Sequence, residues 1–368
     1  MNNVKGQVKF TGKEQQEFFD VLRSRVDEYF RSKGISRHAN LQMVIKSILF
    51  LSLYIAPLLV LMLMPITTGM AILLWLVMGI ALAGIGMSVM HDANHGAYSS
   101  HKWINKMMGH TLNLVGGSVF NWKNQHNILH HTYTNIIEFD EDIDDKLIMR
   151  MSPHTKVKGI HRFQPVYAFL FYGILTLYWA LAKDFIQFRK HSKNGVNPQT
   201  RNQNRITLAK IIFTKVFYFS YTLVIPLMVF KVAALPWIMG YLLMHFTAGM
   251  ILTTVFQLAH TVEGTDHPLP SEAGTLENSW AVHQLRTTVN FSTKNPWISY
   301  YVGGLNFQVE HHLFPRICHV HYPALAPIVA ATAREYGIPY MENPRFIDAL
   351  RSHVRTLRRF GKATLELG

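Results

Sequence analysis

The sequence predicts an all-α integral membrane protein with a cytoplasmic helical cap that holds a histidine-rich metal site. Of its 368 residues, 49% are hydrophobic and only 16% are charged, and mean hydropathy is +0.10. This balance is typical of membrane proteins with sizeable aqueous parts. Three histidine clusters lie next to long apolar stretches: His91-Asp-Ala-Asn-His95, His126-Asn-Ile-Leu-His130-His131 and Gln308-Val-Glu-His311-His312.

The first element expected is an amphipathic helix in the polar N-terminal segment. Thr11-Gly-Lys-Glu14 has the form of a capping box, and Gly34 is a stop signal. Between them, apolar residues recur at four-residue steps: Phe18, Leu22, Val26 and Phe30. The helix is therefore expected to lie on the bilayer or on the protein. We see no secretory signal, so we expect a cytoplasmic N-terminus.

Two apolar runs follow as a helical hairpin. One extends from about Met43 to Met64, and the other continues after Pro65 to about Met90. Each is long enough to cross a hydrocarbon core, which takes roughly 20 residues. A tight turn is expected near Pro65 to Gly69.

Three later apolar stretches compete for the remaining crossings: Val166 to Leu181, Ile211 to Phe230, and about Pro236 to Ala259. The histidine clusters must lie on one side of the membrane to meet, so an even number of crossings is required between His131 and His311. Val166 to Leu181 is the shortest stretch and has basic flanks, so we place it at the interface. The other two then form a second hairpin, which gives four transmembrane helices in two hairpins plus interfacial helices.

The distribution of charge indicates the orientation. The formal net charge is +14, from 36 Lys and Arg against 22 Asp and Glu. The two far-side turns, Pro65 to Gly69 and Lys231 to Leu235, contain one basic residue between them. The positive-inside rule then places the histidines on the cytoplasmic face of a multi-pass protein, in a bacterial inner membrane or the endoplasmic reticulum. The basic excess is expected to meet anionic head groups, with no nucleic-acid partner.

We expect three regions along the chain: a cytoplasmic amphipathic segment over 1–40, a membrane domain with the histidine clusters over 41–315, and a cytoplasmic helical segment over 316–368. The one cysteine, Cys318, excludes an intrachain disulfide framework and any Cys-ligated cluster built from this chain alone.

The histidine spacing predicts a polynuclear metal site. Neutral imidazole suits iron, copper, nickel or zinc, and residues three or four apart share a helical face. In the second cluster His131 would lie about 100° round the helix from His130. In the third, Gln308, His311 and His312 would form a face of a helix kept short by Gly303, Gly304 and Pro315. His260, at the end of the last apolar stretch, makes eight available histidines, enough for two metals.

Two other kinds of metal site fit the sequence less well. A zincin would carry His-Glu-x-x-His, whereas the first cluster has Asp92 and an extra intervening residue. Soluble di-iron bundles use inward Glu and Glu-x-x-His, and the apolar stretches have no such carboxylate pairs.

With these motifs the chain resembles the membrane fatty acid desaturases, whose histidine boxes read HxxxH, HxxHH or HxxxHH, and HxxHH or QxxHH. The resemblance extends from the first apolar run to about Pro315. It implies two iron ions, O2 as co-substrate and two electrons from an external donor, used to remove two hydrogens from neighbouring methylenes of an acyl chain. The ligands it implies are His91, His95, His126, His130, His131, His260, His311 and His312.

Gln308 in place of the first histidine of the third box resembles front-end desaturases, such as Δ6 linoleoyl-type enzymes, acting on acyl-CoA or acyl-lipid. Gln308 is expected as a weak ligand or as a donor that orients one. No His-Pro-Gly-Gly heme motif of a fused cytochrome b5 domain appears, so a separate ferredoxin or cytochrome b5 is the expected donor. The alternatives are a desaturase of other regioselectivity (Δ9), a fatty acyl or sphingolipid hydroxylase, and, more distantly, a histidine-rich metal transporter.

Several further polar residues are candidates for supporting roles. Asp92 and Asn94 in the first box are expected to orient ligands. An acidic run after the second box is expected to bind a cation, to hydrogen-bond imidazoles or to be a solvated loop: Glu138, Asp140, Glu141, Asp142, Asp144 and Asp145. His245 lies within the last apolar stretch, roughly 22 Å from His260 along a straight helix, so we expect it to bond between helices or face a cavity. The other histidines are expected to be structural.

Overall fold

The computed structural model describes residues 8–144 and 148–362, and these residues are mostly helical. The chain forms two compact units. The first unit comprises Met1–Ala39, Gln125–Ala168 and Val255–Gly368, and the second comprises Asn40–Asn124 and Phe169–Thr254.

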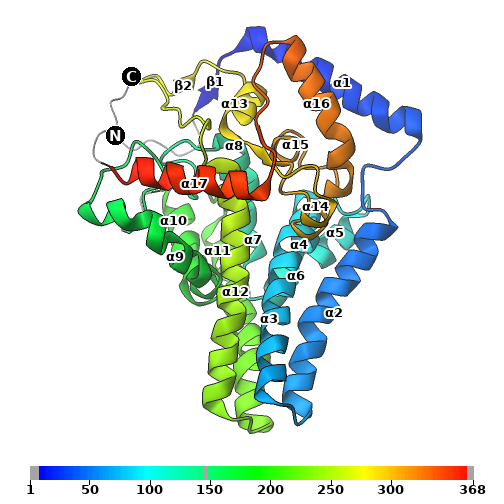
Figure 1. Ribbon diagram of the computed structural model, residues 1–368, viewed down its shortest axis with the longest axis vertical. Coiled ribbons are helices and arrows are strands. Elements are labelled where there is room, and N and C mark those ends of the chain that lie inside the picture. The colour runs from blue at the N-terminus through cyan, green and yellow to red at the C-terminus, as the bar shows by residue number, and fades with distance from the viewer. Residues whose placement is uncertain (1–7, 145–147, 363–368) are drawn as a thin grey trace. The chain divides into compact units, whose positions relative to one another are not determined.

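Two helical hairpins dominate the second unit (Figure 1). In the first hairpin, α2 (Leu41–Leu63) leads through a short turn into α3 (Thr68–Gly84), and the side chains of Asn40 and Thr67 cap the two helices. The expected turn between Pro65 and Gly69 is thus confirmed. In the second hairpin, α11 (Arg201–Phe219) and the π-helical η6 (Ser220–Val229) lead into α12 (Ala234–His260).

Close packing joins the two hairpins of the second unit. The indole rings of Trp75 on α3 and Trp237 on α12 meet edge to face with centroids 5.1 Å apart. A Cβ at position 240 would come within 2.0 Å of the Trp75 indole nitrogen, so only glycine fits there. The hairpins therefore form one helical bundle.

The second unit also contains a buried ion pair. Lys215 on α11 contacts the carboxylate of Asp184 at 2.5 Å and donates to the carbonyls of Gly116 and Trp179. Asn121 and the Trp179 indole donate to the same Asp184 carboxylate. Because a buried charge is tolerated when it is paired and fully hydrogen-bonded, this pair fixes the segment before the second histidine box to the bundle. The other elements with residues in the second unit are η2 (Ile85–Val89), α4 (Met90–His95), α5 (Lys102–Gly109), α6 (Thr111–Leu114), α7 (Val119–Trp122), α9 (Gln164–Tyr178), η5 (Trp179–Lys183) and α10 (Asp184–Lys193).

Five helical segments of the described chain are long and apolar enough to cross a membrane: Leu41–Leu63, Thr68–His95, Gly159–Lys193, Arg201–Val229 and Ala234–His260. Four of them correspond to the spans that the sequence predicts. The remaining one contains the stretch Val166 to Leu181, which continues as helix well beyond both of its expected ends. By length and composition this segment also qualifies, so the number of crossings stays a proposal.

The N-terminal helix α1 (Gln16–Lys33) belongs to the first unit. As predicted, Phe18, Leu22, Val26 and Phe30 are buried, and Gly34 ends the helix in the left-handed conformation with φ 61°. The predicted capping box at Thr11 is wrong. Thr11 follows the strand β1 (Lys9–Phe10), and its hydroxyl donates to the carbonyl of Leu276 in the partner strand β2 (Thr275–Leu276). Because the Thr11 side chain is bonded to a strand, it does not cap the helix.

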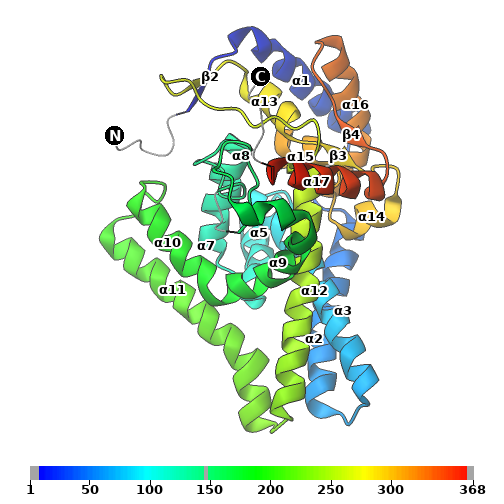
Figure 2. The same ribbon diagram turned by 60° about the vertical axis from the view of Figure 1, so that its left-hand side comes forward.

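The core of the first unit lies between α1, α16 (Tyr322–Glu335) and the third histidine box. Helices α1 and α16 run side by side in both views (Figures 1 and 2). Figure 2 also shows the short parallel strands β3 (Asn290–Phe291) and β4 (Glu342–Asn343). The other elements are η1 (Lys13–Gln15), η3 (Lys123–His130), α8 (His131–Tyr133), η4 (Gly159–Phe163), α13 (Trp280–Thr287), α14 (Pro296–Tyr301), α15 (Gln308–Leu313), η7 (His319–His321) and α17 (Phe346–Phe360).

Candidate metal centre

The second histidine box lies on a π-helical turn, η3, that passes into α8. The wider π-helical turn changes which histidines meet: the Nε2 atoms of His126 and His131 are 3.2 Å apart. The expectation for an α-helix put His131 about 100° round from His130, whereas in this π-helical turn the His126 ring lies close to both, with centroids 5.3 Å from His130 and 4.7 Å from His131. His130 points instead to His260 and His312, with ring centroids 4.7 and 4.9 Å away. π-Helical turns are rare and occur often at functional sites.

The third box lies on α15, which has only six residues, as the flanking glycines and proline predict. His311 meets rings of the second box, with centroids 4.6 Å from His131 and 5.8 Å from His126. His312 stacks on His131 at 4.5 Å. Two boxes far apart in the sequence thus share one buried histidine cluster within the first unit.

His130, His260 and His312 form one group within this cluster. One ring nitrogen of each lies within 4.8 Å of those of the other two, and all three side chains are buried. Gln308 joins them, because its amide nitrogen lies 2.9 Å from His260 Nε2 and 3.4 Å from His312 Nε2. The buried Nε2 of His130 makes no hydrogen bond to the described residues. A buried nitrogen of this kind, facing other imidazoles, fits a metal ligand.

His130 is oriented by the acidic run that follows its box. The carboxylate of Asp140 accepts a hydrogen bond from His130 Nδ1 at 3.0 Å and another from the backbone N–H of Asn135 at 3.0 Å. A second carboxylate, Asp142, lies 3.6 Å from the same ring nitrogen. Of the three alternatives for the run, imidazole bonding is found at Asp140, while Asp145 lies outside the described residues. Burial works to lower the pKa of His130, but the Asp140 carboxylate outweighs it and raises that pKa.

Three other ligand candidates also direct Nδ1 to a protein oxygen. His312 Nδ1 lies 2.8 Å from the Gln284 side-chain oxygen, and His311 Nδ1 lies 3.3 Å from the Tyr322 hydroxyl. His260 Nδ1 lies 3.3 Å from the backbone carbonyl of Thr287. An oxygen at Nδ1 selects the tautomer whose Nε2 lone pair faces a metal. Four imidazoles are therefore arranged to offer Nε2 to the centre of the cluster.

A buried carboxylate fixes the third box from behind. Glu310 accepts from the Tyr340 hydroxyl and from the Asn290 amide, both at 2.8 Å. Asn290 in turn accepts from the backbone N–H of Val309 at 2.9 Å. Burial raises the pKa of Glu310 to about 7, although both donors counteract the rise. Because α15 lacks a side-chain N-cap, these long-range bonds orient it. No spacing rule in the sequence pointed to Glu310, Asn290 or Gln284.

The first box lies in the second unit. His91 and His95 sit one turn apart on α4, with ring centroids 4.8 Å apart, and both rings contact the Trp122 indole at 5.6 Å. Asp92 Oδ1 lies 3.8 Å from His91 Nδ1. The Asn94 amide donates to the carbonyl of Gly109 at 3.1 Å and so ties α4 to α5.

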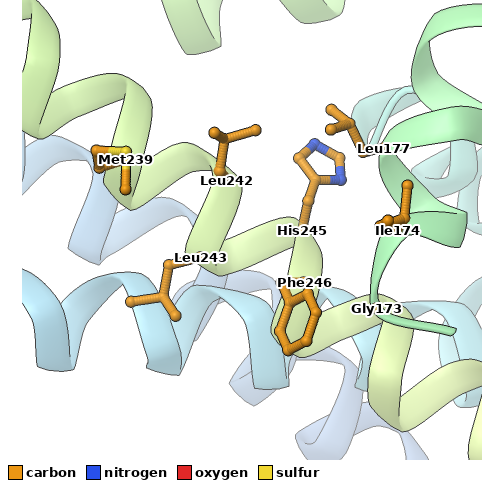
Figure 3. Close-up of a pocket in the computed structure, with 8 residues that line it drawn as sticks. All are labelled: Gly173, Ile174, Leu177, Met239, Leu242, Leu243, His245 and Phe246. Carbon is orange, nitrogen blue, oxygen red and sulfur yellow. The ribbon is translucent and has the colours of Figure 1, made fainter. Parts of the chain in front are cut away.

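His245 both bonds between helices and faces a cavity. In the second unit its ring lies 2.7 Å from the Tyr218 hydroxyl and 3.1 Å from the Thr176 hydroxyl. Figure 3 shows His245 among apolar side chains of α9 and α12, around a cavity of about 310 Å³. The helix α12 is continuous from Ala234 to His260. This is the condition under which His245 is expected to lie roughly 22 Å from His260.

Two histidines expected to be structural are buried in the first unit. His353 on α17 donates to the carbonyl of Thr261 at 2.7 Å, and burial lowers the pKa of His353 to about 4. Burial also lowers the pKa of His283 to about 4, with partial compensation from the Thr134 backbone. Both rings are therefore held neutral at pH 7, which is the usual state of a packed core histidine.

The helices and buried imidazoles together define a class: a helical protein compatible with membrane insertion and carrying a histidine-rich metal site. Residues 67–344 match the family model for fatty acid desaturases. The chain is 37% identical, over 97% of its length and 98% of the relative, to an sn-1 linoleoyl-lipid 6-desaturase of Synechocystis sp..

Two more relatives agree. The chain is 33% identical to an sn-1 linoleoyl-lipid 6-desaturase of Arthrospira platensis, over 93% of this chain and 92% of the relative. It is 32% identical to an acyl-lipid (8-3)-desaturase of Physcomitrium patens, over 99% of this chain and 75% of the relative. The chain belongs to the fatty acid desaturase family. It is an acyl desaturase, an oxidoreductase whose substrate is a lipid.

Proposed function

We propose that the protein is a front-end acyl-lipid desaturase that introduces a cis double bond at the Δ6 position of linoleoyl-type chains. The observation that carries the proposal is full-length similarity to two relatives named for this reaction, at 37% and 33% identity. The position of Gln308 supports it, because this QxxHH feature lies inside the imidazole cluster and not on an outer face. An acyl-CoA carrier remains the alternative to an acyl-lipid.

We propose that the histidine cluster holds two iron ions. The fit rests on the donors present: buried neutral imidazoles, a tautomer fixed at four of them, and one buried Nε2 with no protein partner among the described residues. His130, His260 and His312, with Gln308 beside them, would hold one ion. His126, His131 and His311 would hold the other. By the family resemblance, His91 and His95 of the first box are further proposed iron ligands. When bound, iron supplies the redox chemistry that activates O2 for removal of hydrogen from an unactivated methylene.

The chain's own residues orient the ligands and exclude water. Asp140, Gln284 and Tyr322 hold three ligand rings by Nδ1. The Phe256 ring lies 5.0 Å from His130 and 5.2 Å from His260 and keeps that side of the cluster apolar. Regioselectivity would follow from positioning, since a fixed site selects the methylene pair that lies beside it.

We further propose four membrane crossings, with Gly159–Lys193 at the interface and the histidine cluster on the cytoplasmic face. This arrangement keeps all three boxes on one side and the basic residues inside. In this proposal residues 41–315 carry the catalytic domain, flanked by cytoplasmic segments over 1–40 and 316–368.

The reaction requires an external electron donor. For each double bond, –CH2–CH2– plus O2, two electrons and two protons gives –CH=CH– plus two water molecules. We propose that a separate ferredoxin or cytochrome b5 supplies the two electrons one at a time.

The test is product analysis in a host without polyunsaturated fatty acids, fed linoleic acid in air. We expect a new double bond on the carboxyl side of the existing ones, located by mass spectrometry, and its absence in His130→Ala and His311→Ala. The control is His101→Ala, which changes an exposed histidine outside the cluster. A double bond elsewhere or a hydroxylated product would refute the Δ6 assignment, and full activity in either cluster variant would refute the ligand assignment.

A further inference from the structure

The outer face of α17 is strongly basic. Arg351, Arg355 and Arg358 follow one another at steps of four and three residues, so they form a stripe along the exposed side of the helix. With Arg345, Arg359 and Lys362, six basic residues are exposed there. Two carboxylates counter them: Asp348 pairs with Arg345, and Glu263 pairs with Arg355 at 3.2 Å. Six positive and two negative side chains leave a local net charge of +4.

The opposite face of α17 is covered by the protein itself. Ser352, His353, Thr356, Leu357 and Phe360 are all buried. A helix that lies in a bilayer interface must present an apolar face to the lipid. Among the described residues of α17, four arginines are exposed and one large hydrophobic side chain, Ile347, is exposed at 42%. The outer face therefore fits a charged partner better than a membrane.

The inner face of α17 touches the segment that follows a ligand candidate. His353 Nδ1 donates to the carbonyl of Thr261 at 2.7 Å, and the Ser352 hydroxyl accepts from the backbone N–H of Glu263 at 2.8 Å. Thr261 is bonded directly to His260. One helix therefore connects the basic outer face to the histidine cluster through a single hydrogen bond and a peptide bond.

We infer that the outer face of α17 is the docking surface for an acidic one-electron carrier protein. The inference rests on the proposed function, which needs two electrons from outside for each double bond formed. Two reduced carriers each donate one electron and leave oxidised, and those electrons with two protons and O2 give the two water molecules. Charge complementarity of this kind raises association rates by about 10- to 1000-fold and weakens as salt rises.

The experiment measures donor dependence. The probes are an acidic plant-type [2Fe–2S] ferredoxin and the soluble domain of cytochrome b5, each kept reduced by its reductase and NADPH. The variant reverses the charge of the stripe by three substitutions: Arg351→Glu, Arg355→Glu and Arg358→Glu. We expect about a tenfold or greater rise in the KM for the preferred donor and a weaker salt dependence. The kcat at saturating donor, the KM for the acyl substrate and the bound iron should not change.

Two companion variants keep the result interpretable. Lys13→Glu, Arg23→Glu and Lys33→Glu make the same charge change at exposed positions of η1 and α1, and this variant should behave as wild type. Arg351→Lys, Arg355→Lys and Arg358→Lys preserve the charge and should retain docking. If the charge-reversed variant does not fold, as judged by loss of bound iron, the lysine variant and the salt dependence of the wild-type donor KM decide whether the stripe docks the carrier.

Three outcomes would overturn the inference: equal donor KM in the two charge-reversed variants, binding of neither carrier to the solubilised wild type, or a defect seen only in anionic nanodiscs at saturating donor. The last would assign the stripe to the lipid surface. Because carrier binding is measured directly as well as through turnover, an absence of desaturation would count against the proposed function and not against docking.

Discussion

Asp140→Asn is the substitution that tests most directly how the protein prepares its metal ligands. The Asp140 side chain is about 1% exposed, and its carboxylate accepts from His130 Nδ1 and from two backbone N–H groups, those of Asn135 and Asp142. Asparagine has nearly the same shape but carries no charge and places an NH2 group where an acceptor is needed. The His130 ring would then lose the partner that fixes its tautomer.

The expected magnitude follows from the kind of bond that is lost. Removing the group that orients a metal-binding histidine costs about 10- to 100-fold in metal affinity, which is about 1.4 to 2.8 kcal/mol. A charge-assisted bond with both partners buried belongs at the upper end of that range. The assay is anaerobic titration of chelator-stripped protein with Fe(II) against an indicator of known affinity.

The matched control is Glu138→Gln, which makes the same chemical change at an exposed position of the same acidic run. We expect its Fe(II) affinity to equal that of wild type. Wild-type affinity in Asp140→Asn would refute the reasoning, because it would mean that His130 either binds no metal or needs no anionic partner. A loss of affinity shared equally by both variants would also refute it, since the effect would then come from the charge of the run as a whole.

Three further substitutions give distinct expected results. Gln284→Leu removes the oxygen at 2.8 Å from His312 Nδ1, so Fe(II) affinity in the same titration should fall about tenfold or more, and an unchanged affinity would contradict this. Burial lowers the pKa of His353 to about 4, against about 6.5 in an unfolded chain. Its neutral ring stabilises the fold above pH ~6.5, and this stabilisation is lost as the pH falls toward 4. Between pH 7.5 and 5, the free energy of unfolding in detergent should therefore fall by about 2 kcal/mol more in wild type than in His353→Gln; equal slopes would exclude the linkage. His245→Phe leaves the buried Tyr218 hydroxyl without its partner at 2.7 Å and should destabilise by about 1 to 3 kcal/mol, while bound iron, measured by mass spectrometry, stays at the wild-type level.

Local patterns in the sequence predicted the parts of the fold that local physics decides. The turn after Pro65, the burial of Phe18 and Leu22 on α1, and the short third-box helix all follow from apolar periodicity and from glycine and proline placement. Val166 to Leu181 shows the limit of this reasoning. An apolar window fixes where a helix is stable but not how far helix continues into polar flanks, and here it extends over Gly159–Lys193.

Tertiary contacts decided what the sequence did not reveal. The π-helical turn that brings His126 to His131 has the same local sequence signals as an α-helix, so the pairing of rings in the second box was not predictable from spacing. The Thr11 hydroxyl bonds to a strand residue more than 260 positions away and does not cap the helix that follows it. Gln284 and Glu310 carry no motif at all, because their roles arise only when segments distant in sequence fold together.

The distribution of the orienting groups has a consequence for how the site is assembled. α15 has six residues and α8 has three, so neither helix is long enough to hold its histidines rigidly by its own backbone bonds. The rings are instead fixed by Asp140, Gln284 and Tyr322, each from a different part of the chain. Among these three the charge is uneven, since only His130 is bonded to a carboxylate. The group of His130, His260 and His312 therefore has both the anionic partner and the neutral amide of Gln308 beside it. Because the more basic His130 ligand and the weak neutral donor Gln308 lie at the same proposed metal position, the two proposed positions would be chemically unequal, even though imidazole dominates both.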